Sequence, residues 1–194
     1  MKLPRVQPIF MLVMIALLTK AAFADDNLMQ FQEASRSVVK ELSAQLGSAM
    51  QKEMKANGPV GTIRVCKDIA PAIASDLSRK TGQRVVRVSL KVRNPLTGSP
   101  DAWEQKTLMN FEKRLENETP ANLEFAEVVT EPQGKYLRYM KAIPVQELCL
   151  TCHGKPEAML PQVKEQLTAE YPHDKATGYA MGQIRGAISI KKAI

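Results

Sequence analysis

Hydrophobic residues recur at helical spacing in the first part of the chain. Over residues 28–54 the apolar positions fall on one helical face: Leu28, Phe31, Val38, Leu42, Leu46, Met50 and Met54. This pattern predicts a long amphipathic helix that stops at Asn57-Gly58-Pro59. A second helical region is expected over residues 61–80, with one shared face: Cys66, Ile69, Ile73 and Leu77. Pro71 should break or restart that helix, and Gly82 should end it.

The period changes to two after Gly82. In residues 84–92, four apolar side chains alternate with polar ones and predict a half-buried strand: Val86, Val88, Leu90 and Val92. Residues 101–116 predict a capped helix that buries four side chains: Trp103, Leu108, Phe111 and Leu115. Residues 123–129 and 135–145 flank a turn and predict a hairpin, and residues 182–192 predict a last strand. This order favours an α+β fold with a mainly antiparallel sheet.

The N-terminus has the composition of a secretory signal peptide. Lys2 and Arg5 precede an apolar run over residues 9–18, and Ala22-Phe23-Ala24 follows. That run is too short to span a bilayer comfortably, so we expect cleavage after Ala24 and a periplasmic protein that does not span the membrane. Residues 25–194 then form a single domain.

Net charge argues against nucleic acid as a partner. The whole chain carries +7, and this falls to +4 without residues 1–24, which hold three basic residues and no acidic one. An exported chain without a basic and aromatic tract is not expected to bind nucleic acid. The mild positive charge suits an anionic partner or haem propionates instead.

Residues 149–153 carry the spacing Cys-x-x-Cys-His, which attaches c-type haem. In such motifs the two thiols, here Cys149 and Cys152, bond covalently to one haem, and the adjacent histidine, here His153, is placed to coordinate iron. This spacing rarely arises by chance in a chain of this length.

Two other interpretations of these cysteines stay open. A Cys149–Cys152 disulfide is chemically feasible in an oxidising compartment, although a thioredoxin-like site belongs at a strand-to-helix junction of a βαβ unit. A zinc site would need a second pair of ligands at matching spacing, and none is present.

The remaining candidate residues carry weaker signals. Cys66 on an apolar helix face is by itself more often an inert core residue. Other candidates for a sixth iron ligand are Met140, Met181 and His173, although core packing or a loop position explains each of them. Four residues are candidates to pair with haem propionates, but a solvated strand face explains them equally well: Arg93, Tyr136, Arg138 and Arg185.

Five segments together resemble a known family, and they read VCKDIAP, VRNPLTGSPDAWE, YLRYMKAIPV, CLTCHGKP and YPHDKATGYAMGQIRGAISI. The chain is similar to mono-haem c-type proteins with a PAS-like fold, found in cyanobacteria and in periplasmic sensor regions. The resemblance spans about residues 30–192. It implies an antiparallel PAS-like sheet with a long N-terminal helix and flanking helices, and one covalent haem with iron ligated by His153 and Cys66.

The resemblance implies redox or gas sensing rather than catalysis, with a diatomic gas ligand or a redox or signalling partner protein. The alternative is a periplasmic electron-transfer cytochrome. A cysteine ligand favours sensing, because a thiolate stabilises ferric iron and its bond weakens on reduction. The lack of an output segment favours electron transfer. No acid, base or nucleophile constellation accompanies the motif, so we do not expect an enzyme.

Overall fold

The protein is described by a computed structural model that covers the backbone of residues 9–194 and the side chains from residue 26 onward. The expected signal peptide, residues 1–24, falls outside the residues that are described in full. Among the residues described, no helix is both long enough and apolar enough to cross a membrane.

The first helix, α1 (Ile9–Arg64), is broken where the sequence predicts a stop. Gly58 has φ 67° and ψ −166°, a left-handed region that favours glycine, and Pro59 follows it. The chain then continues through a π-helical turn, η1 (Val65–Ile69), into α2 (Ala70–Thr81), which ends at Gly82. The second predicted helical region therefore consists of three consecutive segments.

Pro71 gives a physical reason for the π-helical turn. In a regular α-helix its ring would clash with the carbonyl of residue 67, and it has no N–H to donate. The wider turn lets the Ala70 N–H bond to the Val65 carbonyl instead, and Pro71 lies in the first turn of α2, where prolines are tolerated. Cys66 is the second residue of this turn.

Four antiparallel strands form one sheet in the order β1-β4-β3-β2. They are β1 (Arg84–Val88), β2 (Glu124–Glu131), β3 (Gly134–Pro144) and β4 (Ile184–Ala193). The predicted α+β class, the hairpin and the last strand are confirmed. The first strand is shorter than predicted and ends at Val88. It is buried on both faces and not on one, since Val85 packs in the cluster beneath α1 and α2 and Val88 packs in the cluster beneath α4 (Ala102–Arg114).

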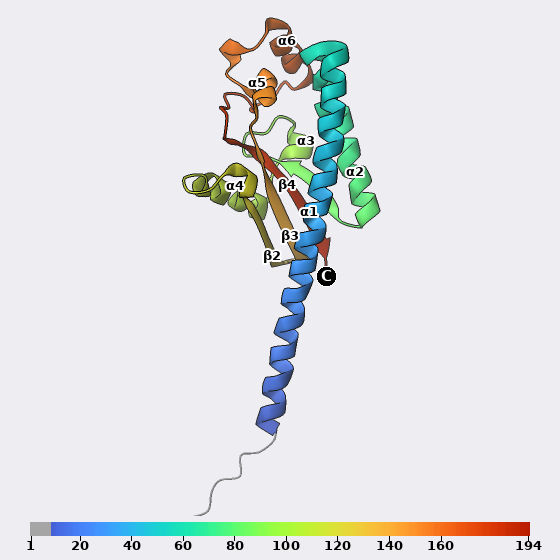
Figure 1. Cartoon of the computed structure of the whole chain (residues 1–194), viewed down its shortest axis with the longest axis vertical. Helices are drawn as coiled ribbons and strands as arrows, with labels where there is room; N and C mark the ends of the chain where they lie inside the picture. Colours follow the sequence, from blue (N-terminus) through green and yellow to red (C-terminus); the bar gives the residue numbers. More distant parts are fainter. Residues whose placement is uncertain (1–8) are drawn as a thin grey trace, which may run out of the picture.

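Helices cover both faces of the sheet (Figure 1). On one face α1 and α2 pack on a cluster that includes Leu42, Leu77, Tyr139 and Ile190. On the other face lies α4, which contributes Leu108 and Phe111 to a second cluster. The helix begins with a capping box, because Asp101 accepts from the Glu104 N–H and Glu104 accepts from the Asp101 N–H.

The remaining helices are short. They are α3 (Pro95–Gly98), α5 (Glu147–His153) and α6 (Pro161–Glu170), with brief 3₁₀ turns at Pro120–Asn122 and Pro156–Ala158. Sequence patterning did not predict α6. Helices α5 and α6 lie together at one end of the sheet (Figure 1), and they position the cysteine motif.

Candidate functional site

The whole Cys-x-x-Cys-His motif lies on α5. Cys149 and Cys152 are three residues apart, so both thiols lie on the same side of the helix. Their surroundings differ, because Cys149 packs beside Val145, Ala176 and Tyr179. Cys152 packs against a cluster built from the end of α1, α6 and Tyr171.

A loop that precedes β4 holds His153. The imidazole Nδ1 is 2.7 Å from the Ala176 carbonyl oxygen. A carbonyl only accepts hydrogen bonds, so Nδ1 carries the proton and Nε2 keeps its lone pair. Backbone bonds from Gly178 to Gly154 and from Tyr179 to His153 tie the same loop to the end of α5. This arrangement fixes the ring by its Nδ1, as second-shell contacts do for metal-binding histidines.

His153 is kept neutral by its surroundings. Burial lowers its pKa well below the usual range, and the charges of Arg185 and Arg93 lower it further. Arg185 donates from Nε toward His153 Nε2 at 3.3 Å. Burial and the neighbouring charges of Arg93 and Arg87 also lower the pKa of Arg185. The side chain of His153 therefore offers a neutral, oriented nitrogen donor.

One cavity joins the motif to Cys66. It has a volume of about 970 Å³ and is lined by residues that include Cys66, Cys149, Cys152 and His153. This volume lies near the upper end of the range for small-molecule and cofactor sites. Below, "the site cavity" means this space. The structure thus brings together the two motif cysteines, the histidine and the third cysteine, which is 83 residues upstream of Cys149.

Cys66, which lines the site cavity, lies in the π-helical turn between α1 and α2. Lys67, the next residue, forms an ion pair with Glu170 on α6, which ties this turn to the helices around the motif. Single π-helical turns are frequent at functional sites. This local geometry distinguishes Cys66 from a cysteine in a regular helix of the core and favours a functional role.

All three cysteines are free thiols in the structure. Burial raises the pKa of the Cys152 thiol to about 11, and nearby Cys66 and Cys149 act in the same direction, while Arg93 opposes the shift. Within the described residues no group of three or more His, Cys, Asp or Glu side chains is close enough to hold a metal ion.

Arg93 lines the site cavity, but contacts within the protein already occupy its guanidinium group. It pairs with Asp174 at 2.9 Å and donates to the carbonyl oxygens of Cys152 at 2.5 Å and Ala176 at 3.3 Å. These contacts fasten the end of α5 to the loop that holds His153. Arg93 therefore has an evident structural role in the site.

Tyr136 and Arg138 do not belong to this site, which corrects the sequence-based expectation. Neither residue lines the site cavity. Arg138 pairs with Asp101, Glu104 and Glu131, and Lys191 stacks on the Tyr136 ring. Alternation along a strand identifies two faces, but it does not tell which residues line the site.

The alternative ligands Met140, Met181 and His173 do not line the site cavity. Met140 is buried on the α4 face, and Met181 and His173 are exposed. Sequence reasoning missed other residues that do line it, among them Met50, Met54, Arg87 and Ser89. Arg87 and Ser89 alternate with apolar residues, a pattern that also fits a solvated strand face.

Comparison with known proteins identifies the family. A family model described as Tll0287-like matches residues 17–192. The chain belongs to the Tll0287-like family. Among solved structures it is similar to one described as the crystal structure of the cyanobacterial heme-protein Tll0287. The TM-score is 0.64, the identity is 22%, and the match covers 84% of this chain and 95% of that one. At this identity the likeness shows the shared fold. No protein with a curated description matches.

Proposed function

We propose that this member of the Tll0287-like family is a periplasmic mono-haem c-type protein. In this proposal Cys149 and Cys152 hold one haem covalently, and His153 and Cys66 are the axial ligands of its iron. The observation that carries the proposal is the convergence of these four side chains on the site cavity. The description of the similar solved structure as a heme-protein supports it.

The donor set fits a c-type haem. Two thiols on one side of a short helix match the two thioether links of such a group, and the adjacent His153 has its Nδ1 bound to Ala176. The free Nε2 is the nitrogen suited to iron. Ligation through Nε2 requires the Arg185 side chain to turn away from His153, because a guanidinium and a metal ion cannot share this position.

Cys66 suits the role of second ligand better than the other residues considered. It lines the site cavity, whereas Met140, Met181 and His173 do not. A soft thiolate is also a known haem ligand. When bound, haem supplies an iron centre that changes oxidation state and binds diatomic gases. Because Cys66 lies at the junction of two helices, the strength of its bond would affect how α1 meets α2, which favours redox or gas sensing.

Covalent attachment is tested first. The protein is matured in a bacterial host with cytochrome c assembly machinery and run on a denaturing gel stained for haem. Stain should stay with the wild-type chain, and its mass should rise by one haem. Cys149→Ser/Cys152→Ser should remove the stain, whereas Cys66→Ser should keep it. Haem that acid and organic solvent extract from the wild type would contradict the proposal.

Axial ligation is tested by absorption and electron paramagnetic resonance spectra. Cys66→Ser replaces a soft sulfur donor with a poor neutral oxygen donor, so thiolate features of the ferric spectrum should disappear and the reduction potential should rise. His153→Ala should open one side of the iron while attachment remains. If Cys66→Ser keeps the wild-type spectrum and potential, the ligand lies elsewhere, and Met50 and Met54 are the next residues to replace because both line the site cavity.

The choice between sensing and electron transfer depends on ligand exchange. Spectra of the reduced protein are recorded with and without carbon monoxide or nitric oxide. Displacement of an axial ligand by either gas, or upon reduction, supports sensing. Six-coordinate spectra that stay unchanged in both oxidation states would instead support a periplasmic electron-transfer role.

A further inference from the structure

Four arginines line the site cavity, and they differ in how their charge is compensated. Arg84 has Glu104 as its carboxylate partner. Arg93 has Asp174 as its carboxylate partner. Arg87 and Arg185 line the same space, but no ion pair joins either of them to another residue in the described part of the chain. An uncompensated charge beside a largely apolar cavity is costly unless a ligand neutralises it.

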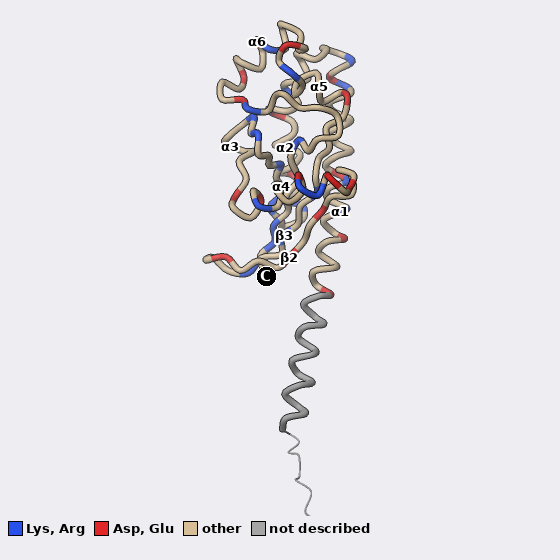
Figure 2. The backbone as a smooth tube through the Cα atoms, turned by 90° about the vertical axis from the view of Figure 1, so that its left-hand side faces the viewer, with Lys and Arg blue, Asp and Glu red and all other residues tan. Residues whose placement is uncertain are grey.

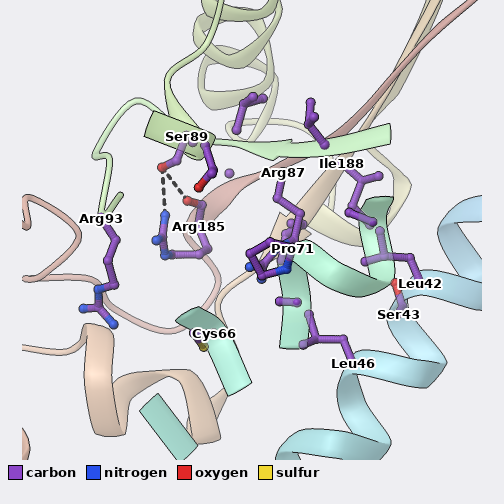
Figure 3. Close-up of a pocket in the computed structure, with 18 of the residues that line it drawn as sticks. Leu42, Ser43, Leu46, Cys66, Pro71, Arg87, Ser89, Arg93, Arg185 and Ile188 are labelled. Carbon is purple, nitrogen blue, oxygen red and sulfur yellow. Dashed lines mark hydrogen bonds between the residues drawn. The ribbon is translucent and has the colours of Figure 1, made fainter. Parts of the chain in front are cut away.

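The hydrogen bonds of Arg185 leave part of its guanidinium available. Its Nη1 donates to Ser89 Oγ at 2.8 Å and to the Lys91 carbonyl at 3.4 Å. Its Nε points to His153. Its Nη2 has no hydrogen-bond partner among the described residues, and neither does any guanidinium nitrogen of Arg87. Figure 3 shows the Arg185 side chain turned toward Ser89, whereas the Arg87 side chain extends toward α2.

The surroundings of Arg87 are mostly apolar. Figure 3 shows its side chain reaching toward Pro71 of α2, beside Leu42 and Leu46 of α1 and Ile188 of β4. Ser43 is the labelled polar side chain on that side. Such a mixture of apolar wall and two guanidinium groups suits a ligand with an apolar body and one carboxylate. Guanidinium groups match the planar carboxylate with paired hydrogen bonds.

We infer that Arg87 and Arg185 form a carboxylate-binding site in the site cavity. The bound carboxylate belongs to one of two ligands. It is either a haem propionate, in which case the inference rests on the proposed function, or the carboxylate of a free small acid with an apolar body. The sequence-based candidates included Arg185 but not Arg87, so the inference adds Arg87 to the site.

The experiment compares wild-type protein with Arg87→Gln, Arg87→Lys and a control, Arg79→Gln. Arg79 is an exposed arginine of α2 outside the cavity, so its replacement makes the same change in net charge. Because no hydrogen bond holds Arg87 to its neighbours, Arg87→Gln should fold normally. Each protein is first stained for covalent haem. Resonance Raman spectra then report the propionate bending band, and thermal unfolding with increasing benzoate, an apolar carboxylate, reports free-acid binding.

If the carboxylate is a propionate, Arg87→Gln shifts the bending band, Arg87→Lys shifts it less, and Arg79→Gln leaves it unchanged. Benzoate then stabilises none of the proteins. If the carboxylate is a free acid, benzoate raises the melting temperature of wild-type protein. Its affinity should fall about tenfold in Arg87→Gln, because one charge-assisted contact is lost, and the bending band does not move.

The inference is overturned if Arg87→Gln shows the wild-type bending band and the wild-type response to benzoate. Equal stabilisation of all four proteins by benzoate would also overturn it, since binding would then occur elsewhere. Failure of the proposed function is distinguishable, because a chain without covalent haem gives no stain but still reports benzoate binding through its melting temperature.

Discussion

Arg138 of β3 and Arg185 of β4 carry the same charge on neighbouring strands, yet their surroundings are opposite. Arg138 is 1% exposed and pairs with Asp101, Glu104 and Glu131, and its guanidinium carbon lies 4.4 Å from the centre of the Trp103 ring. Arg185 faces the site cavity and has no carboxylate partner within the described residues. The comparison distinguishes a charge that the fold neutralises from one left for a ligand.

The neutralised region is a network between the sheet and α4. Glu104 is fully buried and bonds with Arg84 and with the hydroxyl of Ser189 as well as with the α4 cap. Glu131 links Arg138 to Lys191. Arg185, by contrast, bonds only to hydroxyl, carbonyl and imidazole groups among the described residues. Lys, Arg, Asp and Glu are interspersed over the domain as a whole (Figure 2), so the contrast is local.

The largest expected effect is on the stability of the network. Arg138→Ala should lower the free energy of unfolding by about 3–5 kcal/mol, because it removes a buried cation and leaves the buried Glu104 with Arg84 alone, whose side chain is half exposed. Urea unfolding followed by circular dichroism measures this change. A loss below about 1 kcal/mol would mean that the network does not depend on Arg138.

A substitution at Gly186 tests how closely β4 approaches β1 at the cavity end of the sheet. A Cβ at this position would lie 2.3 Å from the Val88 carbonyl oxygen on the neighbouring strand. Gly186→Ala should therefore separate β1 from β4 and cost about 1–3 kcal/mol. Gly47→Ala is the control, since a Cβ there meets nothing within 4 Å and alanine favours a helix by up to about 1 kcal/mol. Equal stability of the two variants would contradict the close approach.

Arg185→Met should change the free energy of unfolding by less than about 1 kcal/mol in protein without bound ligand. The variant loses hydrogen bonds to Ser89 and Lys91, each worth about 1 kcal/mol net, but it also removes a partly buried charge that has no carboxylate partner. Urea unfolding beside Arg138→Ala gives the direct comparison. A loss as large as that of Arg138→Ala would remove the distinction between the two arginines.

The smallest expected effect is on the stability of the protein at acidic pH. A hydrogen bond from Lys191, then the charges of Lys191 and Arg138, lower the pKa of Glu131 despite partial desolvation. A carboxyl whose pKa is lower when folded contributes stability above its unfolded pKa and loses it as pH falls through the folded pKa. Stability should therefore decrease below about pH 4.5. The free energy of unfolding is measured with urea from pH 6 to pH 3. It should decrease less in Glu131→Gln than in Glu112→Gln, a control at an exposed glutamate. Identical slopes would contradict this role.

Much of the architecture was predictable because it follows from local patterns. The hairpin, the last strand, the break at Gly58 and the end at Gly82 are encoded by alternation and by turn residues. Helix α6 was missed because only Val163 and Leu167 are buried on its ten residues, too few for a clear helical period. The motif at Cys149 was recognisable because its spacing is itself the chemical requirement.

The site around the motif was less predictable because it depends on contacts between distant segments. Arg138 and Arg185 look alike in the sequence, and only packing against α4 separates them. Helical spacing does place Cys66 on an apolar face, but the π-helical turn changes that spacing, and it arises from Pro71 five residues later. The loop at Ala176 that orients His153 carries no local signal of that role.

The sheet order also fixes when the site can form. The last strand, β4, lies between β1 and β3, so the first and final strands of the chain must pair before the sheet is complete. Pairings between residues so far apart in sequence are slow to form. During synthesis Cys149, Cys152 and His153 are therefore joined to the growing chain before the strand that completes the wall around them. Until β4 pairs with both neighbours, the wall of the site cavity lacks Arg185, Gly186 and Ile188, which β4 contributes.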